Sequence, residues 1–515
     1  MDFANLIPQK ICTKNKVNNS SDVYLYNGVS GDDYSFACDK LEKEGYTIYE
    51  SRSFGNAHFY RAYSKADAGV FVNFFKNTAS MTIVKEESCR YFSFTDTLGD
   101  NICSPSLTQM KLKDYGMSYV VRLMDGRYII LDGGREFEED ADRLFEFLKN
   151  DSSNTPQIAA WILTHPHDDH YRCFVTFYDK YCDCVKIEKF LYNFPDKDDT
   201  EHYPALIKGR PGVDNSSAQD LIPVIEERIA QSGADVYMLQ TGQAYNIGGA
   251  TLEIIGGISD TINLSRNINS ISVVIKMQIA GQTILFGTDS VFRDLRLGVK
   301  YGEYLKSDII QLPHHGLGHG VQGEEINEYS YIRPETCFMS HASLSGNMML
   351  RAFKSDLEYL VKEVGVKEIL SGEATRSVTL PYTPNPNKQT ECQKAFDLGK
   401  RSAGANVWTF MGMNTGCTED LEFNVLNVVA SSPKINVDVY FENRAQNISY
   451  SVVFKSALCF GRLNILDIGA NDEQFAFKPE VISKPIPENT EFSVRFVSDT
   501  PVFISNKNHT DIYHS

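Results

Sequence analysis

Long apolar runs are missing from this sequence, and their absence excludes one class of protein. No stretch reaches the roughly 18 apolar residues that a helix needs to cross a bilayer. The first residues, MDFANLIPQKICTKNK, also lack the basic and then apolar order of a signal peptide. Paired cysteines are missing as well, because the eleven cysteines are odd in number and scattered, apart from Cys182 and Cys184. Such usage is typical of a reducing compartment and not of a disulfide scaffold, so we expect a cytoplasmic protein.

Positive charge is also in short supply. The chain has 50 Lys and Arg against 67 Asp and Glu, which gives a net charge of −17. This balance argues against a surface that sheathes nucleic acid, because phosphate contacts need clustered cations. The sequence contains no G-x-x-x-x-G-K-[ST] loop and no convincing dinucleotide-binding fingerprint, so these two routes to nucleotide binding are not expected.

The chain of 515 residues is too long for one hydrophobic core, and its pattern changes twice. Residues 1–107 hold one helical stretch and then short aromatic and β-branched runs such as AHFYRAY and GVFVNFF, which predict a small α+β module. Residues 108–412 alternate strand and helix patterns, which predicts an α/β layered domain. Residues 413–515 carry short strands at regular intervals, which predicts a β-sandwich.

Several elements of the central domain are expected at definite places. SYVVRLMDGRYIILDGG predicts two strands joined by a tight turn at Asp125 and Gly126. QIAAWILT predicts a buried strand. Helices are expected at residues 136–150, 216–233, 291–305 and 349–364.

Histidine is scarce, yet it is concentrated at one place. Three of the eleven histidines fall within HPHDDH. An H-x-H-x-x-H pattern would arise by chance on the order of once in 200 chains of this length and histidine content. Residues i and i+2 of an extended segment point the same way, so His165 and His167 can reach one cation, and Pro166 favours that extended form. Asp169 and His170 follow where the chain turns into a helix, and they can reach a second cation close by.

These nitrogen and oxygen donors suit two divalent metal ions, with zinc as the first expectation and manganese or iron as alternatives. Two cations that share a water lower its pKa and make hydroxide at neutral pH. The other interpretations are a histidine-rich loop without function and a single structural metal. A structural site closes with four ligands, often cysteine, whereas this cluster follows a strand and has further candidates downstream. The pattern therefore favours a catalytic centre.

HPHDDH resembles the H-x-H-x-D-H signature of the metallo-β-lactamase fold superfamily of metal-dependent hydrolases. The resemblance covers about residues 112–345. It implies an αββα sandwich for the central domain, between the N-terminal α+β module and the C-terminal β-sandwich. It also implies that His165 and His167 hold one cation and that Asp169 and His170 hold the other. Asp132, in YIILDGG, resembles the acid of the first motif, which hydrogen-bonds and fixes the metal loop.

Two later segments extend the resemblance. Asp289, in QTILFGTDS, resembles the acid whose carboxylate bridges both cations. His314 and His315 stand in a P-H-H-G turn that is similar to one in the soluble hydrolase domain of bacterial DNA-uptake channel proteins and related phosphoesterases. The resemblance implies that one of these histidines is a ligand, while the other supports it or acts as a general acid. A departure is that Thr288 separates Asp289 from the preceding glycine, where that branch has glycine and aspartate adjacent.

The histidine that usually completes the first metal site has no clear counterpart here. His202, in DTEHYP, is a candidate, and an exposed loop histidine is the alternative. If no histidine serves, water completes the site or the centre is mononuclear. His341, in ETCFMSHAS, is a further candidate for the last ligand. Asp168 is expected to face solvent or to support a ligand histidine, and Cys182 and Cys184 to be separate thiols and not a metal site.

Four functions remain open on the sequence. The first is a hydrolase of a phosphodiester or small, nucleotide-like phosphoester, in which a metal-bridging hydroxide attacks and Asp169, His314 and His315 are the catalytic groups. The acidic charge favours small substrates over long polyanions. The second keeps the centre and hydrolyses a lactone, thioester or β-lactam. The third is redox use of a di-iron centre, which needs an electron-delivering partner or flavin module that the sequence lacks. The fourth is a catalytically inert binding protein, whose C-terminal domain mediates dimers or protein contacts. No membrane partner is expected.

Overall fold

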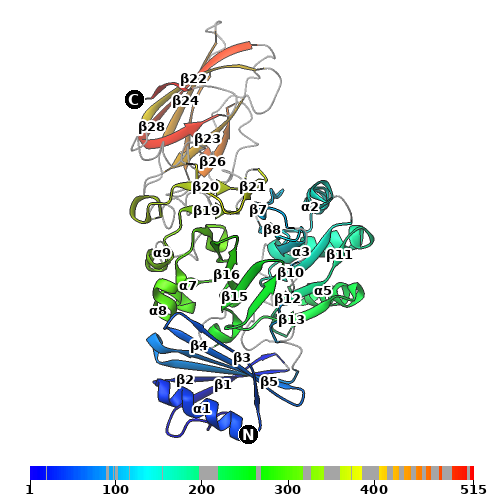
Figure 1. The fold of residues 1–515 in the computed structure, drawn as a ribbon. Coiled ribbons are helices and arrows are strands. Elements are labelled where there is room, and N and C mark those ends of the chain that lie inside the picture. The colour runs from blue at the N-terminus through cyan, green and yellow to red at the C-terminus, as the bar shows by residue number, and fades with distance from the viewer. Residues whose placement is uncertain are drawn as a thin grey trace. The chain divides into compact units, whose positions relative to one another are not determined.

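A computed structural model gives the fold (Figure 1). It describes residues 1–18, 20–88, 92–96, 98, 102–114, 116–152, 155–196, 218–262, 268–316, 326–340, 360–372, 374–385, 405–414, 421–427, 434–441, 448–454, 460–465, 475–477, 490–506 and 511–514. The chain divides into two compact units, residues 1–342 with 356–388 and residues 343–355 with 389–515. The division into three domains at residues 108 and 413 stays a prediction, since the first unit includes both the N-terminal sheet and the central layers.

The N-terminal part is a six-stranded antiparallel sheet of order β1-β2-β6-β5-β4-β3. Its strands are β1 Cys12–Asn18, β2 Ser21–Asn27, β3 Thr47–Phe54, β4 His58–Lys65, β5 Ala68–Phe75 and β6 Ser80–Glu86. Helix α1, Gly31–Lys43, begins with a capping box in which Ser30 and Asp33 each bond the other's backbone amide. The buried face of α1 packs on one side of the sheet in a cluster that includes Leu41, Val72 and Ile83. The predicted α+β pattern of this region is therefore present.

The first central sheet has the order β13-β12-β10-β9-β8-β7-β21, with β11 beside β10. Its strands are β7 Ser106–Gln109, β8 Ser118–Arg122, β9 Tyr128–Asp132, β10 Gln157–Leu163, β11 Lys186–Ile187, β12 Lys189–Tyr192, β13 Asp235–Met238 and β21 Arg376–Thr379. Helices α2 Glu138–Asp151, α3 Asp168–Tyr181 and α5 Ala218–Ser232 lie on its outer side (Figure 1). Trp161 of β10 packs edge-on against Phe174 and Phe177 of α3, which fixes that helix on the sheet.

The second central sheet has the order β14-β15-β16-β17-β18-β19-β20. Its strands are β14 Ala244–Ile247, β15 Ala250–Gly256, β16 Val274–Ile279, β17 Gln282–Phe286, β18 Ile309–Gln311, β19 Thr336–Met339 and β20 Glu368–Ser371. Short helices accompany it, namely α6 Ile258–Thr261, α7 Phe292–Leu295, α8 Leu297–Tyr301 and α9 Ile326–Ile332. Side chains of both sheets, among them Leu131, Ile275 and Phe338, form one buried core cluster. The layered αββα fold class is thereby confirmed.

Strand direction brings the sequence motifs together. β9 and β10 run parallel, and so do β17 and β18. Asp132 is the last residue of β9 and His165 lies two residues beyond β10, while Asp289 and His315 follow the ends of β17 and β18. Because parallel strands end at the same edge of their sheet, each pair of motifs emerges together. The two sheets pack on a common core, which leaves all four motifs at one end of the layers.

One predicted helix is wrong in its extent. Residues 291–305 do not form a single helix; α7 ends at Leu295, α8 begins at Leu297, and a 3₁₀ turn covers residues 302–305. Arg296 and Gly302 interrupt the helix, with φ values of 54° and 56° in the left-handed region. The helical spacing of apolar residues shows which face of a helix is buried, but it does not show where the backbone adopts left-handed φ values. Of the helix predicted at residues 349–364, residues 349–359 lie outside the described part of the chain.

The C-terminal unit is rich in strands, as predicted. They are β22 Ala405–Asn414, β23 Glu422–Asn427, β24 Lys434–Phe441, β25 Ile448–Phe454, β26 Phe460–Asn464, β27 Phe475–Phe477, β28 Thr490–Ser505 and β29 Asp511–His514. Strand β28 pairs with β22, β23 and β24, so the strands belong to one hydrogen-bonded sheet. Their alternate side chains, including Phe410, Val437 and Phe496, form one buried cluster. In the described parts of the chain, no helix has the length and apolar character needed to span a membrane.

Candidate metal centre

The first group of candidate ligands lies at the mouth of β10. His165 Nε2 is 3.1 Å from His167 Nδ1, and it is 4.0 Å from Asp289 Oδ2. These three side chains each offer one ligand atom within 4.8 Å of the others. Two nitrogens bound to one tetrahedral zinc at 2.0–2.1 Å are about 3.3 Å apart. The spacing of the two histidines therefore fits a shared cation.

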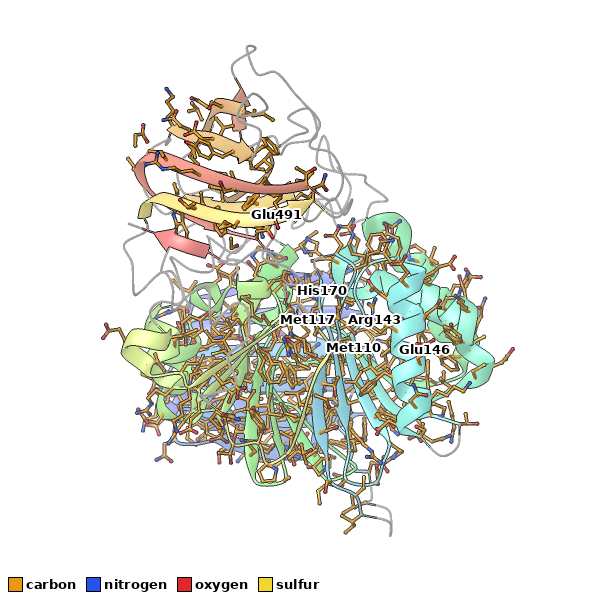
Figure 2. All side chains as sticks on the ribbon, turned by 90° about the horizontal axis from the view of Figure 1, so that it is seen from above. Met110, Met117, Arg143, Glu146, His170 and Glu491 are labelled. Carbon is orange, nitrogen blue, oxygen red and sulfur yellow. The ribbon has the colours of Figure 1, made fainter. Side chains whose placement is uncertain are left out.

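The second group stands next to the first and uses the same carboxylate. It consists of Asp169, His170, Asp289 and His315, which are all buried. Asp289 Oδ1 lies 3.2 Å from His170 Nε2, while its Oδ2 lies 3.4 Å from His315 Nε2. His315 Nε2 also lies 3.0 Å from Asp169 Oδ2. Asp289 thus belongs to both donor groups, and its role as a ligand of two cations, which the resemblance implies, stays a prediction. In Figure 2, His170 is seen close to Met117, and the backbone amide of Met117 donates to the carbonyl of Asp169.

Asp132 organises the histidines from behind. Its carboxylate accepts three hydrogen bonds, from the Thr164 amide at 2.8 Å, the Thr164 hydroxyl at 2.7 Å and His170 Nδ1 at 2.7 Å. The Thr164 oxygen lies 3.1 Å from His165 Nδ1. Because the hydroxyl hydrogen goes to Asp132, that oxygen accepts the Nδ1 hydrogen of His165. Both histidines consequently turn Nε2 toward the ligand groups. Hydrogen-bond partners of metal-ligating histidines typically fix the orientation of the ring in this way.

The electrostatics of the two groups differ. Burial lowers the pKa of His165 and of His167, so both are neutral and keep a lone pair for a cation. Burial also acts to lower the pKa of His170, but Asp289 and Asp132 outweigh it and hold that pKa well above 6.5. For His315 the carboxylates of Asp289 and Asp169 likewise outweigh burial and raise the pKa to about 9.

The carboxylates respond in the opposite sense. Burial alone would raise the pKa of Asp169 and of Asp289, but the charges of His170 and His315 lower both below the usual range. The ionised carboxylates of Asp169 and Asp289 therefore stand in contact with His170 and His315 in a buried place, where each charge depends on its partners.

The residues fit a pair of divalent cations on a further ground. The buried atoms His170 Nε2 and Asp289 Oδ1 face each other at 3.2 Å as an ion pair. A nitrogen and an oxygen that converge in this way can hold a cation between them. Imidazole nitrogen and carboxylate oxygen are donors that suit zinc, iron or manganese.

The backbone around these donors is held in uncommon conformations. Asp132, Thr288, His314 and His315 have φ values of 56°, 52°, 48° and 59°, which lie in the left-handed region. Thr288 is the residue that departs from the pattern of the resembling branch. Its amide bonds Gln311 Oε1 at 2.5 Å and its hydroxyl bonds the Val273 carbonyl at 2.9 Å, which carries Asp289 into the site. Strain that tertiary contacts maintain in this way is common where function requires it.

The two adjacent histidines take different positions. His315 is buried with Nε2 among the carboxylates, whereas the His314 side chain is 26% exposed and its Nε2 lies 4.0 Å from Asp289 Oδ2. Asp168 pairs with Arg135 at 3.3 Å, outside both ligand groups. Cys182 and Cys184 lie in a 3₁₀ turn as free thiols. His202 and His341 lie outside the described residues.

Three residues at the site were not predicted from the sequence. Thr164 stands directly before HPHDDH, Gln311 stands before the P-H-H-G turn, and Ser340 stands before His341. Ser340 Oγ lies 3.0 Å from His315 Nδ1. Each is next to a motif in the chain, but nothing in one sequence distinguishes a polar neighbour that supports a ligand from one that does not.

The sequence comparison agrees with the geometry. Residues 113–257 match the family described as the metallo-beta-lactamase superfamily. Curated protein sequences give no match. The matched segment contains Asp132 and the whole HPHDDH motif, so the resemblance to this superfamily is confirmed for the part of the chain that holds the first motifs.

Solved structures give further similarities. Zn(2+)-bound PqqB from Methylobacterium extorquens is 11% identical, with a TM-score of 0.26, and covers 55% of this chain and 82% of its own. BJP-1, a subclass B3 metallo-beta-lactamase of Bradyrhizobium japonicum, is 14% identical, with a TM-score of 0.25 and coverages of 43% and 77%. The Anabaena sensory rhodopsin transducer is 16% identical, with a TM-score of 0.16 and coverages of 20% and 96%.

Proposed function

We propose that this chain, which carries a metallo-beta-lactamase superfamily segment at residues 113–257, is a metal-dependent hydrolase that binds two divalent cations and cleaves a phosphoester. One observation carries the proposal: His165 and His167 on one side, and Asp169, His170 and His315 on the other, converge on the single carboxylate of Asp289. A shared carboxylate between two donor groups can hold two cations close together, as two-metal catalysis needs.

The chain's own residues would act as follows. His165, His167 and Asp289 would hold one cation, and Asp169, His170, His315 and Asp289 the other, with zinc first and manganese or iron as alternatives. Bound together, two divalent cations lower the pKa of a water that they share and neutralise charge on phosphoryl oxygens. Asp132 and Thr164 would keep the histidine rings in place while these charges develop.

His314 is the residue best placed for proton transfer. It sits beside the ligand groups, yet part of its ring reaches solvent, so it is not enclosed by carboxylates as His315 is. We assign it the role of giving a proton to the leaving oxygen. A positioned general acid contributes roughly 10²- to 10⁴-fold to the rate.

The substrate class rests on the motif order and on charge. The P-H-H-G turn resembles that of phosphoesterases, and the net charge of −17 disfavours long polyanions, so we propose a small phosphodiester or phosphomonoester. A lactone, thioester or β-lactam is the alternative, because the same fold supports attack on a carbonyl carbon.

The metal centre can be tested with two adjacent aspartates. Asp169→Asn removes a charged donor from the second group, so the metal content should fall from about two ions per chain to about one. Asp168→Asn is the matched control, because Asp168 pairs with Arg135 outside both groups and should leave the content unchanged. Elemental analysis of protein purified without chelator gives the answer. Equal metal content in both variants, or none in the wild type, would refute the proposed centre.

The substrate class needs a separate assay on the loaded protein. We expect turnover of bis-p-nitrophenyl phosphate or p-nitrophenyl phosphate, and none of a lactone, a thioester or a chromogenic β-lactam. Turnover of a carbonyl substrate alone would move the function to the second class. A protein with two bound ions and no turnover of any of these would favour the binding-protein hypothesis.

The compartment is part of the same proposal. The cysteines that the structure describes, Cys12, Cys38, Cys103, Cys173, Cys182, Cys184 and Cys337, are free thiols. Free thiols in this number support a reducing compartment such as the cytoplasm.

A further inference from the structure

A buried chain of hydrogen bonds leads away from His315 into the core between the two sheets. His315 Nδ1 lies 3.0 Å from Ser340 Oγ, at the end of β19. Burial raises the pKa of the Tyr119 hydroxyl on β8, and a hydrogen bond from Ser340 acts to lower that pKa. The Tyr119 hydroxyl donates to Gln109 Oε1 on β7 at 2.5 Å. All four side chains are at most 3% exposed, so water has little access to this chain.

The order of donors and acceptors along this chain is fixed from its far end. Tyr119 gives its hydrogen to Gln109, so its oxygen is left to accept the hydrogen of the Ser340 hydroxyl. The Ser340 oxygen is then left to accept the hydrogen on His315 Nδ1. The consequence is that His315 presents Nε2, and not Nδ1, toward Asp169 and Asp289.

Two other ligand histidines, His165 and His170, are also held through Nδ1, but by different partners. His170 Nδ1 has the carboxylate of Asp132, and His165 Nδ1 has the Thr164 hydroxyl, which leads to Asp132. The partner of His315 Nδ1 is the neutral hydroxyl of Ser340. Ser340 and Tyr119 therefore occupy for His315 the place that Asp132 occupies for His170.

We infer that Ser340 and Tyr119 are positioning residues for the metal centre, which hold His315 in the Nδ1–H form with Nε2 directed at the second cation. The inference rests on the proposed function, because it needs that cation. Ser340 touches the ligand, and Tyr119 acts through Ser340. Partners of ligating histidines typically contribute 10- to 100-fold in metal affinity. A neutral partner is the weaker kind, so we expect about 10-fold for Ser340 and less for Tyr119.

The experiment uses the full-length chain loaded with Co²⁺. Titration gives the affinity for the second ion, and proton NMR of the cobalt form shows the exchangeable ring N–H of each ligating histidine as a shifted resonance. His315→Ala identifies the resonance of His315. In Ser340→Ala the second ion should bind about 10-fold more weakly, and the His315 resonance should be lost through exchange with water.

Three further variants separate positioning from general damage. Ser340→Thr keeps the hydroxyl and should restore both the affinity and the resonance. Tyr119→Phe should weaken the second ion less than Ser340→Ala does, with faster exchange of the same resonance. Tyr128→Phe is the control, because Tyr128 is equally buried and its hydroxyl bonds Asp151, away from His315. It should leave both readouts unchanged.

The outcomes distinguish this inference from the proposed function. If the wild type binds two Co²⁺ and His315→Ala binds one, the metal centre stands. Ser340→Ala with wild-type affinity and an unchanged resonance would then overturn the positioning role alone. A wild type that takes up no Co²⁺ would overturn the metal centre and the positioning role with it.

Discussion

At the scale of single residues, one carboxylate determines how two histidines face the site. Asp132 is fully buried and accepts three hydrogen bonds from Thr164 and His170. Because Thr164 passes its hydroxyl hydrogen to Asp132, its oxygen can hold His165. A substitution of Asp132 or Thr164 would therefore disturb a ligand histidine in each of the two groups.

Thr164→Val tests this arrangement. The valine keeps the shape, but it leaves His165 Nδ1 without its acceptor and takes one donor from Asp132. We expect a loss of about 1–3 kcal/mol in the free energy of unfolding and roughly 10- to 100-fold weaker binding of the first cation. Thr164→Ser should restore most of both.

Thr108→Val is a matched control, since Thr108 is as buried and its hydroxyl bonds Ser377. It should destabilise the fold without changing metal affinity. Urea denaturation and zinc titration measure the two quantities. Unchanged metal binding in Thr164→Val would show that the hydroxyl does not orient His165.

At the scale of elements, the turn after β18 joins a strained backbone to the chemistry. His314 and His315 both have left-handed φ, and the His314 amide bonds the carbonyl of Thr288 at 2.8 Å. Thr288 is itself left-handed and is held by Gln311, the last residue of β18. The segments after β17 and β18 therefore hold each other and place Asp289 and His315 together.

Substitution of His314 by glycine and by alanine separates strain from chemistry. Both variants lose the imidazole, but only glycine adopts φ of 48° without cost. His314→Gly should therefore be about 1 kcal/mol more stable than His314→Ala. Both should lose turnover equally, by about 100-fold for esters with a poor leaving group and much less for p-nitrophenyl esters. Equal stability of the two variants would mean that the turn carries no strain at this residue.

At the scale of the whole first unit, the N-terminal sheet packs closely on the second central sheet and the loops beside it. A Cβ on Gly242 would meet the ring of Tyr60 of β4 at 2.3 Å, which shows how closely that ring packs on the backbone of Gly242. Glu86 of β6 accepts from Ser21 at 2.5 Å and from Gln240 Nε2 at 2.7 Å. Burial raises the pKa of Glu86 to about 8, so the carboxyl is protonated in the folded protein at neutral pH.

Glu86 should make the stability of this unit depend on pH. Its pKa is about 4.5 when unfolded and about 8 when folded, so between these values unfolding releases a proton. The free energy of unfolding is then greatest below about pH 4.5 and falls as the pH rises through 8, by roughly 3–5 kcal/mol from this group. Glu86→Gln stays neutral and should flatten that fall between pH 5.5 and 8.5.

The control is Glu87→Gln, which removes the neighbouring, exposed carboxylate. The charge of Glu87 is the smallest cause of the raised pKa of Glu86, so the slope should stay near that of the wild type. Urea denaturation can be followed by the fluorescence of Trp161 in a Trp408→Phe background, because Trp161 and Trp408 are the two tryptophans and lie in different units. Parallel pH profiles for Glu86→Gln and the wild type would contradict the assignment.

Much of the fold follows from local patterns in the sequence. Apolar alternation and the Asp-Gly turn predicted β8 and β9 correctly, and helical spacing predicted α2 and α5 within a few residues. These signals succeed because each element must bury one face, and the spacing of its apolar side chains shows which face that is. The same signals failed at residues 291–305, where left-handed backbone at Arg296 and Gly302 breaks the helix without a change in apolar period.

The sequence by itself determined the donors: HPHDDH, Asp289 and the P-H-H-G turn supply imidazole and carboxylate groups, whatever the fold. Only the tertiary structure decided which of them meet. It separated buried His315 from half-exposed His314, and it brought Thr164 and Ser340 behind the ligand rings. The physical reason is that ligand type is a property of one side chain, whereas coordination and proton placement depend on distances of a few ångströms between residues far apart in the chain.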